Sequence, residues 1–308
     1  MKLRRPESEL TGGAAYVEFL IAFIPLFVLS MGMIQMALMY AADLVVQHSA
    51  TTAARAAVVV LDDDPRLYDG AARRRVDHSG RSSSEGALSG ILGLLGGGGA
   101  APGGGAAPTG GPRLSAIRQA ASLPLMAISP SLDQLMGTDE SVRSAIGSPA
   151  SRAATGALAY NDSAMGVTFP TGPGSSSYRS SFPPGHDVQV TTRVTYLFHC
   201  GVPLANRLMC ETYPSLRLGP AAGIVEGIVR DLGDGSLSWE EARRRIERAD
   251  RSRRRHERDE EAIGELESAG GSDLMYMTWA TGARFKVLRA EATMPLQYAG
   301  YCYGGSDC

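Results

Sequence analysis

The chain has 308 residues, with 30 Lys and Arg against 32 Asp and Glu, which gives a formal net charge of −2. This near balance leaves no sustained basic excess and argues against a nucleic acid as the main partner. The length is sufficient for one or two modest domains beside any membrane segment.

An uncharged apolar stretch near the N-terminus, Phe19 to Ala42, dominates the sequence, and Gln35 is its only strongly polar residue. As a helix rising about 1.5 Å per residue, this stretch would be about 36 Å long. That length is enough to cross the hydrocarbon core of a bilayer, which is about 30 Å thick. A core helix of a soluble domain has a polar face, and this stretch has none. We therefore predict a membrane-spanning helix.

The segment before the apolar stretch, residues 1–13, carries Lys2, Arg4 and Arg5 and ends in Thr-Gly-Gly. A secretory signal peptide has an apolar region of about 7–15 residues followed by a cleavage site of small residues. Here the apolar run is longer and the small residues precede it. Residues 43–62 contain a single Lys or Arg, Arg55. The positive-inside rule thus predicts a cytoplasmic leader and an extracytoplasmic C-terminal part.

The junction reads Gly13, Ala, Ala, Tyr, Val, Glu18, with a carboxylate at the start of the apolar run. It resembles the processing site of type IV prepilin-like proteins, which a membrane peptidase cuts after the glycine. Cutting there would make Ala14 the first residue of the mature chain and Glu18 the fifth. Together with Val-Glu-Phe, Pro25 and the Ala-Ala-Arg-Ala-Ala run at 53–57, the segment resembles the TadE-like pseudopilin family of the tight-adherence pilus machinery.

The resemblance implies a minor pseudopilin, a structural subunit involved in assembly or initiation of a pilus. It also implies a single-pass protein of the inner (plasma) membrane, either resident there or incorporated into an extracellular pilus. The implied partners are the membrane, a prepilin peptidase, other pilins or pseudopilins and the pilus assembly platform. An alternative of a different class is a single-pass membrane-anchored periplasmic binding or adhesion module that is never polymerised.

The resemblance implies that Glu18 acts in assembly. Its partner would be the α-amine that cleavage creates at Ala14, either on the same chain or on a neighbouring one. An ionisable residue at the edge of a bilayer is costly and is by default a functional hypothesis. The simpler interpretation is that Glu18 lies among lipid headgroups, favoured by the positive end of the helix dipole. Pro25 removes one backbone hydrogen bond and predicts a kink in the transmembrane helix.

The residues after the apolar stretch keep a helical pattern, so we predict one transmembrane and stalk helix over residues 14–61. Asp62, Asp63, Asp64 and Pro65 end it, because a residue before proline disfavours the helical conformation. The composition of residues 62–113, with long Gly-rich runs, predicts a flexible linker. Residues 114–308 are expected to form the extracytoplasmic domain, with a charged helical insertion at about 215–282 whose helix, 237–266, is solvated.

Two strands are predicted in this domain. Residues 188–198 alternate apolar and polar side chains with the period of a half-buried strand. Residues 285–294 resemble a partner strand, and a change of phase at Val287 and Leu288 predicts a bulge. Pro295 is expected at a sheet edge because proline cannot donate to a ladder. The fold class is therefore α+β, a long N-terminal helix followed by a disulfide-containing domain with a small antiparallel sheet.

The four cysteines, Cys200, Cys210, Cys302 and Cys308, all lie in the part assigned outside the cytoplasm, where disulfides persist. Four cysteines allow three pairings, and the sequence does not select one. We favour the two local pairs, Cys200 with Cys210 and Cys302 with Cys308. A zinc site with His199 is the rival interpretation, but the cysteine spacings do not fit it.

The sequence contains none of the hydrolase, zinc-protease or nucleotide-binding motifs Gly-x-Ser-x-Gly, His-Glu-x-x-His and Gly-x-x-x-x-Gly-Lys-Ser/Thr. The five histidines are scattered through unlike contexts. We therefore predict no catalytic residue, no metal site and no cofactor, and expect the protein not to be an enzyme.

Overall fold

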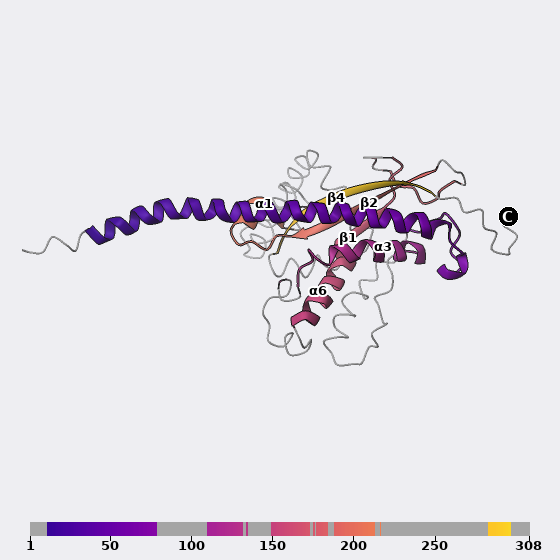
Figure 1. Ribbon diagram of the computed structural model, residues 1–308, viewed down its shortest axis with the longest axis horizontal. Helices are drawn as coiled ribbons and strands as arrows, with labels where there is room; N and C mark the ends of the chain where they lie inside the picture. Colours follow the sequence, from indigo (N-terminus) through magenta and orange to yellow (C-terminus); the bar gives the residue numbers. More distant parts are fainter. Residues whose placement is uncertain are drawn as a thin grey trace, which may run out of the picture.

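The computed structural model of the protein describes residues 11–78, 110–131, 134, 149–172, 175, 177–183, 188–212, 216 and 283–296. Its longest element is a single helix, α1, from Thr11 to Asp62. The N-terminal part of α1 extends away from the rest of the molecule, and its C-terminal part lies along a small sheet (Figure 1). The α+β class predicted from the sequence is confirmed. The Gly-rich run at 79–109, the charged insertion apart from the isolated Leu216, the helix expected at 237–266, Cys302 and Cys308 lie outside the described residues.

The C-terminal half of α1 is part of the domain core rather than a free stalk. Its fully buried residues recur every three or four positions, so they form one continuous stripe along the helix. These residues are mostly alanines, whose small side chains let the helix backbone approach the elements it covers. Arg55, between them in sequence, is exposed, as expected for a solvated face. The stripe is Ala42, Val46, Ala50, Ala53, Ala57 and Leu61.

Within the described residues, the sheet has four antiparallel strands in the order β1-β2-β4-β3. Its two long strands, β2 and β4, are the two predicted from the sequence. They pair without interruption from Gln189 opposite Pro295 to His199 opposite Phe285, so the expected bulge at Val287 and Leu288 is wrong. The strands are β1 (Met165–Thr168), β2 (Gln189–His199), β3 (Glu211–Thr212) and β4 (Arg284–Pro295).

Strand β2 is buried on both faces, whereas its alternating sequence predicted burial of one face. The polar residues on the second face are satisfied by direct cross-strand pairs with β4. Arg193 Nε donates to Glu291 Oε1 at 2.7 Å, and the hydroxyls of Thr191 and Thr293 lie 2.9 Å apart. Pairing of this kind allows polar side chains to be buried without losing hydrogen bonds.

Helices α3 (Pro112–Leu125) and α6 (Pro149–Ala164) complete the core beside α1 and β2. The Ser49 hydroxyl of α1 donates to the Ala121 carbonyl of α3 at 2.6 Å, which shows how closely the two helices approach. Tyr160 of α6 donates its hydroxyl to the Leu197 carbonyl of β2. Burial raises the pKa of the Tyr160 phenol well above its usual value, so the group remains a donor.

A buried arginine caps the C-terminal end of α1. Arg113, 1% exposed, donates to the carbonyls of Val60, Asp63 (3.0 Å) and Ala71 (3.1 Å). Its guanidinium also lies 4.5 Å from the centre of the Tyr68 ring. The last carbonyls of a helix lack intrahelical partners, and a cation there also interacts favourably with the helix dipole. Desolvation lowers the pKa of Arg113 from its usual value.

The chain after α1 remains packed on the domain as far as residue 78, although residues 62–113 were expected to be a flexible linker. A short 3-10 helix, η2 (Pro65–Tyr68), follows α1. The Val76 side chain is 1% exposed, and its backbone N–H donates to the Ser180 carbonyl at 2.8 Å. Arg74 forms an ion pair with Asp62 at 2.8 Å. The acidic run that ends the helix therefore also anchors the turn that follows.

Candidate membrane-anchoring and assembly site

The helix α1 includes the predicted processing junction. It begins at Thr11, so the bond between Gly13 and Ala14 lies in the first helical turn, where backbone N–H groups have no intrahelical acceptor. Glu18 is exposed, one turn beyond Ala14 on the same side of the helix because residues at i and i+4 are neighbours. The Glu18 carboxylate is therefore accessible to a neighbouring molecule.

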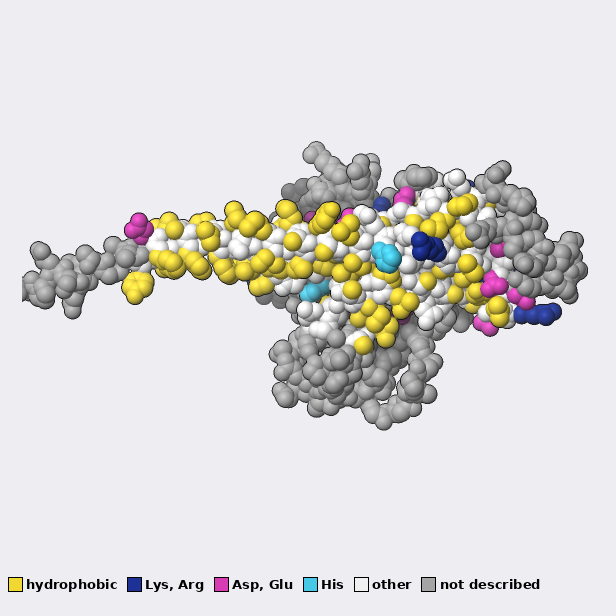
Figure 2. Space-filling view, viewed as in Figure 1, with side chains coloured by type: hydrophobic (Ala, Val, Ile, Leu, Met, Phe, Trp, Pro, Cys, Tyr) yellow, Lys and Arg dark blue, Asp and Glu magenta, His cyan; other side chains and the backbone are white. Residues whose placement is uncertain are grey.

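The apolar part of α1 is uncovered by the rest of the protein. The helix from Tyr16 to Asp62 contains an 18-residue window with a mean hydropathy of 2.3, none of which is buried within the protein. Apolar side chains cover this part of the helix on the face seen in Figure 2. Pro25 lies inside α1, which continues through it. The uncovered apolar surface supports single-pass membrane anchoring.

Three phenylalanines form a ladder on one face of this uncovered part. The ring centres of Phe19 and Phe23 are 5.2 Å apart and nearly parallel, and those of Phe23 and Phe27 are 5.7 Å apart. The spacing of four residues places the rings on consecutive turns. They present a broad aromatic strip to lipid or to another apolar helix.

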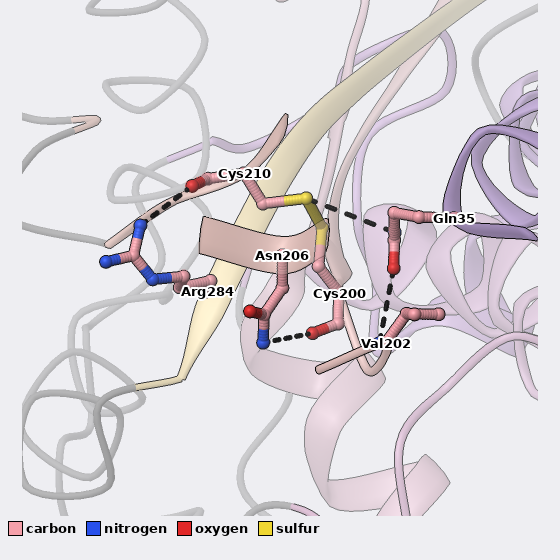
Figure 3. The surroundings of a disulfide bond; sticks show 6 residues. All are labelled: Gln35, Cys200, Val202, Asn206, Cys210 and Arg284. Carbon is pink, nitrogen blue, oxygen red and sulfur yellow. Dashed lines mark hydrogen bonds between the residues drawn. A yellow bond between two sulfur atoms is a disulfide. The ribbon is translucent and has the colours of Figure 1, made fainter. Parts of the chain in front are cut away.

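Gln35 is the first buried residue of α1 in the segment from residue 16 onward, and its side chain points toward the disulfide loop (Figure 3). Its side chain is fully buried, and its Oε1 accepts a hydrogen bond from the backbone N–H of Val202 at 3.2 Å. Its amide nitrogen lies 4.0 Å from the Sγ of Cys210. The only strongly polar residue of the apolar stretch therefore finds its hydrogen-bond partners in the domain.

This contact shortens the part of α1 that a bilayer can surround. The prediction placed the span at Phe19 to Ala42, but the domain covers Gln35 and Ala42. From Ala14 to Ile34 the helix is about 30 Å long, which equals the thickness of the hydrocarbon core. The span therefore fits a helix that begins at the predicted cleavage site and ends where the domain begins.

The loop that contacts Gln35 is closed by a disulfide between Cys200 and Cys210, with an S–S distance of 2.00 Å. This is the first of the two pairs favoured from the sequence. Asn206 Nδ2 donates to the Cys200 carbonyl at 3.4 Å, and Arg284 Nη1 donates to the Cys210 carbonyl at 3.1 Å. The loop is thus fixed to α1 on one side and to β4 on the other (Figure 3).

His199, the residue proposed as a zinc ligand in the rival interpretation, packs against Phe285 with ring centres 5.7 Å apart. Desolvation lowers the pKa of its imidazole. The two neighbouring cysteines are consumed by their disulfide and offer no thiolate to a metal. Within the described ranges, no group of three or more His, Cys, Asp or Glu side chains is arranged to hold a metal ion.

Two structural residues went unrecognised in the sequence. Gln35 had a detectable signal, because a lone amide in an apolar stretch of membrane-spanning length requires a partner. Arg113 had none, since it follows a Gly-rich run and resembles any surface arginine. Its partners, the end of α1 and the turn at Ala71, are about 40–50 residues away in sequence and become its neighbours only in the fold.

Residues 13–55 match the model of a family described as TadE-like protein. The match covers the processing junction, the uncovered apolar helix and most of the buried stripe of α1. It confirms the resemblance inferred from the sequence over this part of the chain. No curated protein and no solved structure is significantly similar to the chain.

The contact of Gln35 with the disulfide loop yields a test. Replacing Gln35 by Leu keeps the helix apolar but leaves the buried Val202 N–H without its acceptor. An unsatisfied buried donor costs about 1–3 kcal/mol, so we expect the detergent-solubilised protein to unfold at lower urea concentration. We also expect dithiothreitol to reduce the Cys200–Cys210 bond faster, because the loop opens more often.

The matched control is Gln47→Leu. Gln47 lies on the same helix but is exposed, and its side-chain amide donates to Asp43 at 2.9 Å, within the helix. This variant should retain the parent's urea midpoint and reduction rate. Equal behaviour of the Gln35 and Gln47 variants would contradict the role given to Gln35.

Proposed function

We propose that this protein is a membrane-anchored structural subunit of a tight-adherence-type pilus machinery, a minor pseudopilin that takes part in assembling or initiating the filament. The observation that carries the proposal is the uncovered apolar helix that begins at a prepilin-like junction and lies within the segment matched by the TadE-like model. The proposal assigns the protein a structural role and no enzymatic one.

In this proposal, a prepilin peptidase cuts after Gly13 at the cytoplasmic face and exposes the α-amine of Ala14. The helix then remains in the inner membrane, with the domain on the extracytoplasmic side. The Glu18 carboxylate attracts the α-amine of a neighbouring subunit, since a charge at the membrane edge is stabilised by an opposite charge. The phenylalanine ladder of Phe19, Phe23 and Phe27 packs against neighbouring apolar helices, as aromatic rings do at protein interfaces.

The extracytoplasmic side also suits the disulfide. Disulfides persist in oxidising compartments and are rare in the cytosol. The Cys200–Cys210 bond therefore supports the orientation that the positive leader predicts by an independent argument. The same orientation leads us to propose a second disulfide between Cys302 and Cys308.

The processing step is tested by intact-mass analysis of protein extracted from membranes of a host that has the peptidase. The proposal predicts a chain that begins at Ala14 and lacks Met-Lys-Leu-Arg-Arg-Pro-Glu-Ser-Glu-Leu-Thr-Gly-Gly. A Gly13→Leu variant, in which the residue before the cut is enlarged, is the control and should keep its leader. An intact leader on the parent protein would rule out the pseudopilin and favour an anchored binding or adhesion module that is never polymerised.

The assembly role of Glu18 is tested by Glu18→Gln. The amide keeps the size of the side chain but removes the charge that attracts an α-amine, and a neutral group is no harder to place at the membrane edge. We expect unchanged membrane levels and cleavage, with less of the variant sedimenting with sheared pili. The control, Asp43→Asn, changes a carboxylate on the same helix beyond the membrane segment and should sediment like the parent. Parent-like recovery of Glu18→Gln in pili would leave Glu18 as a residue of the headgroup region only.

A further inference from the structure

The loop closed by the Cys200–Cys210 disulfide presents two exposed leucines, which none of the described residues buries. Its one-turn helix, α7 (Ala205–Met209), has Leu208 75% exposed, and Leu204 just before it is 50% exposed. Ala205 and Cys210 are buried against the domain. The loop thus holds its small and sulfur-bearing residues inward and its two leucines outward.

Both leucines belong to the same short turn of the chain. Leu208 lies in α7, and Leu204 is the non-helical residue that directly precedes this helix. Arg207, also exposed, lies between them, and its backbone N–H donates to the Leu204 carbonyl at 3.1 Å. Leu204 has a φ of 66°, a left-handed conformation that is unfavourable for a leucine. Such strain in an exposed apolar residue points to a functional reason for its position.

The position of the loop along α1 identifies what covers it. The backbone N–H of Val202 donates to Gln35, so the loop lies at the level of α1 where the uncovered apolar helix ends. A bilayer that surrounds the helix from Ala14 to Ile34 has its outer surface at this level. The exposed leucines therefore belong to the loop that contacts α1 at this boundary.

We propose that residues 201–209 form a membrane foot, a loop that inserts Leu204 and Leu208 into the outer interface of the bilayer. Apolar side chains of surface-bound helices are buried about 5–10 Å into the boundary between headgroups and acyl chains. Arg207 extends its guanidinium into the headgroup layer, where lipid phosphates accept its hydrogen bonds. The foot is a second contact with lipid beside α1. It fixes the tilt of the domain over the membrane, because one helix alone leaves the domain free to rock.

The disulfide gives the foot its rigidity. It ties the two ends of the loop together next to Gln35, so the leucines remain presented when no lipid is present. A preformed loop inserts without first losing conformational entropy. This inference rests on the membrane anchoring in the proposed function, but it requires neither cleavage nor polymerisation.

The test uses the full-length protein in nanodiscs that hold a single copy, so that no neighbouring subunit can cover the loop. Leu208→Trp places a fluorophore on the foot, and its emission is obtained by subtracting that of the parent, which has two tryptophans. Lipids brominated near the carboxyl end of their acyl chains quench a tryptophan at the interface. We expect Leu208→Trp to lose at least as much emission as Phe27→Trp, which lies deeper in the membrane segment than these bromines.

The matched control is Leu67→Trp, because Leu67 is 71% exposed but follows the distal end of α1. It should lose no emission in brominated discs. Leu204→Trp provides a second reporter on the foot if Leu208→Trp does not form the native disulfide.

Each other outcome overturns the proposal. Quenching of Phe27→Trp without quenching of either foot reporter would show that the helix is anchored and the loop stays off the membrane. A blue-shifted but unquenched foot reporter would assign the leucines to a protein contact. Absence of quenching at Phe27 itself would remove the membrane anchor and, with it, both the foot and the proposed function.

Discussion

The structure depends on the packing of one helix, α1. Its N-terminal part is an exposed apolar segment long enough to cross a membrane, and its C-terminal part is buried in the core of the domain. From Ala42 to Leu61 its inward face is fully buried against α3 and the sheet. Burial of a Val or Leu side chain contributes about 1.5–3 kcal/mol. The net free energy of unfolding of a typical domain is only about 5–15 kcal/mol, so exposing Val46 and Leu61 would remove a sizeable part of it. The helix is therefore an indispensable part of the domain core, and the apolar segment that precedes it is rigidly joined to the domain.

This rigid connection determines how the protein meets a bilayer. Because the domain covers α1 from Gln35 onward, the position of the membrane surface is set by a protein contact and not by hydrophobicity alone. The apolar residues beyond that point, such as Tyr40 and Leu44, stay exposed on the opposite side of the helix. A domain held in this way transmits any movement of the transmembrane helix directly to the sheet, since no flexible hinge separates them within the described residues.

The sequence predicted the elements whose signals are local. Three patterns each lie within one short segment: an uncharged stretch of membrane-spanning length, the alternation in β2 and a short cysteine spacing. The structure contains the long helix, the strand and the local disulfide that these patterns predicted. The sequence did not predict features that depend on contacts between residues far apart in the chain. The polar residues on the second face of β2 can be buried because Glu291 and Thr293, directly opposite them, complete their hydrogen bonds. Arg113 caps a helix that ends about 50 residues earlier in the sequence. The bulge in β4 was predicted because the apolar alternation breaks at Val287 and Leu288. In the structure both side chains are partly exposed, and the pairing with β2 continues past them without a bulge.

Two truncated chains, one beginning at Gln35 and the other at Asp63, test whether the second half of α1 belongs to the core of the domain. Both lack the membrane segment, and only the first retains the buried stripe. We expect the chain from Gln35 to form the Cys200–Cys210 bond and to unfold cooperatively in urea. The chain from Asp63 should have no cooperative transition, because the sheet and α3 lose the helix that covers them. A cooperative transition at the same urea concentration in both chains would contradict this role of α1.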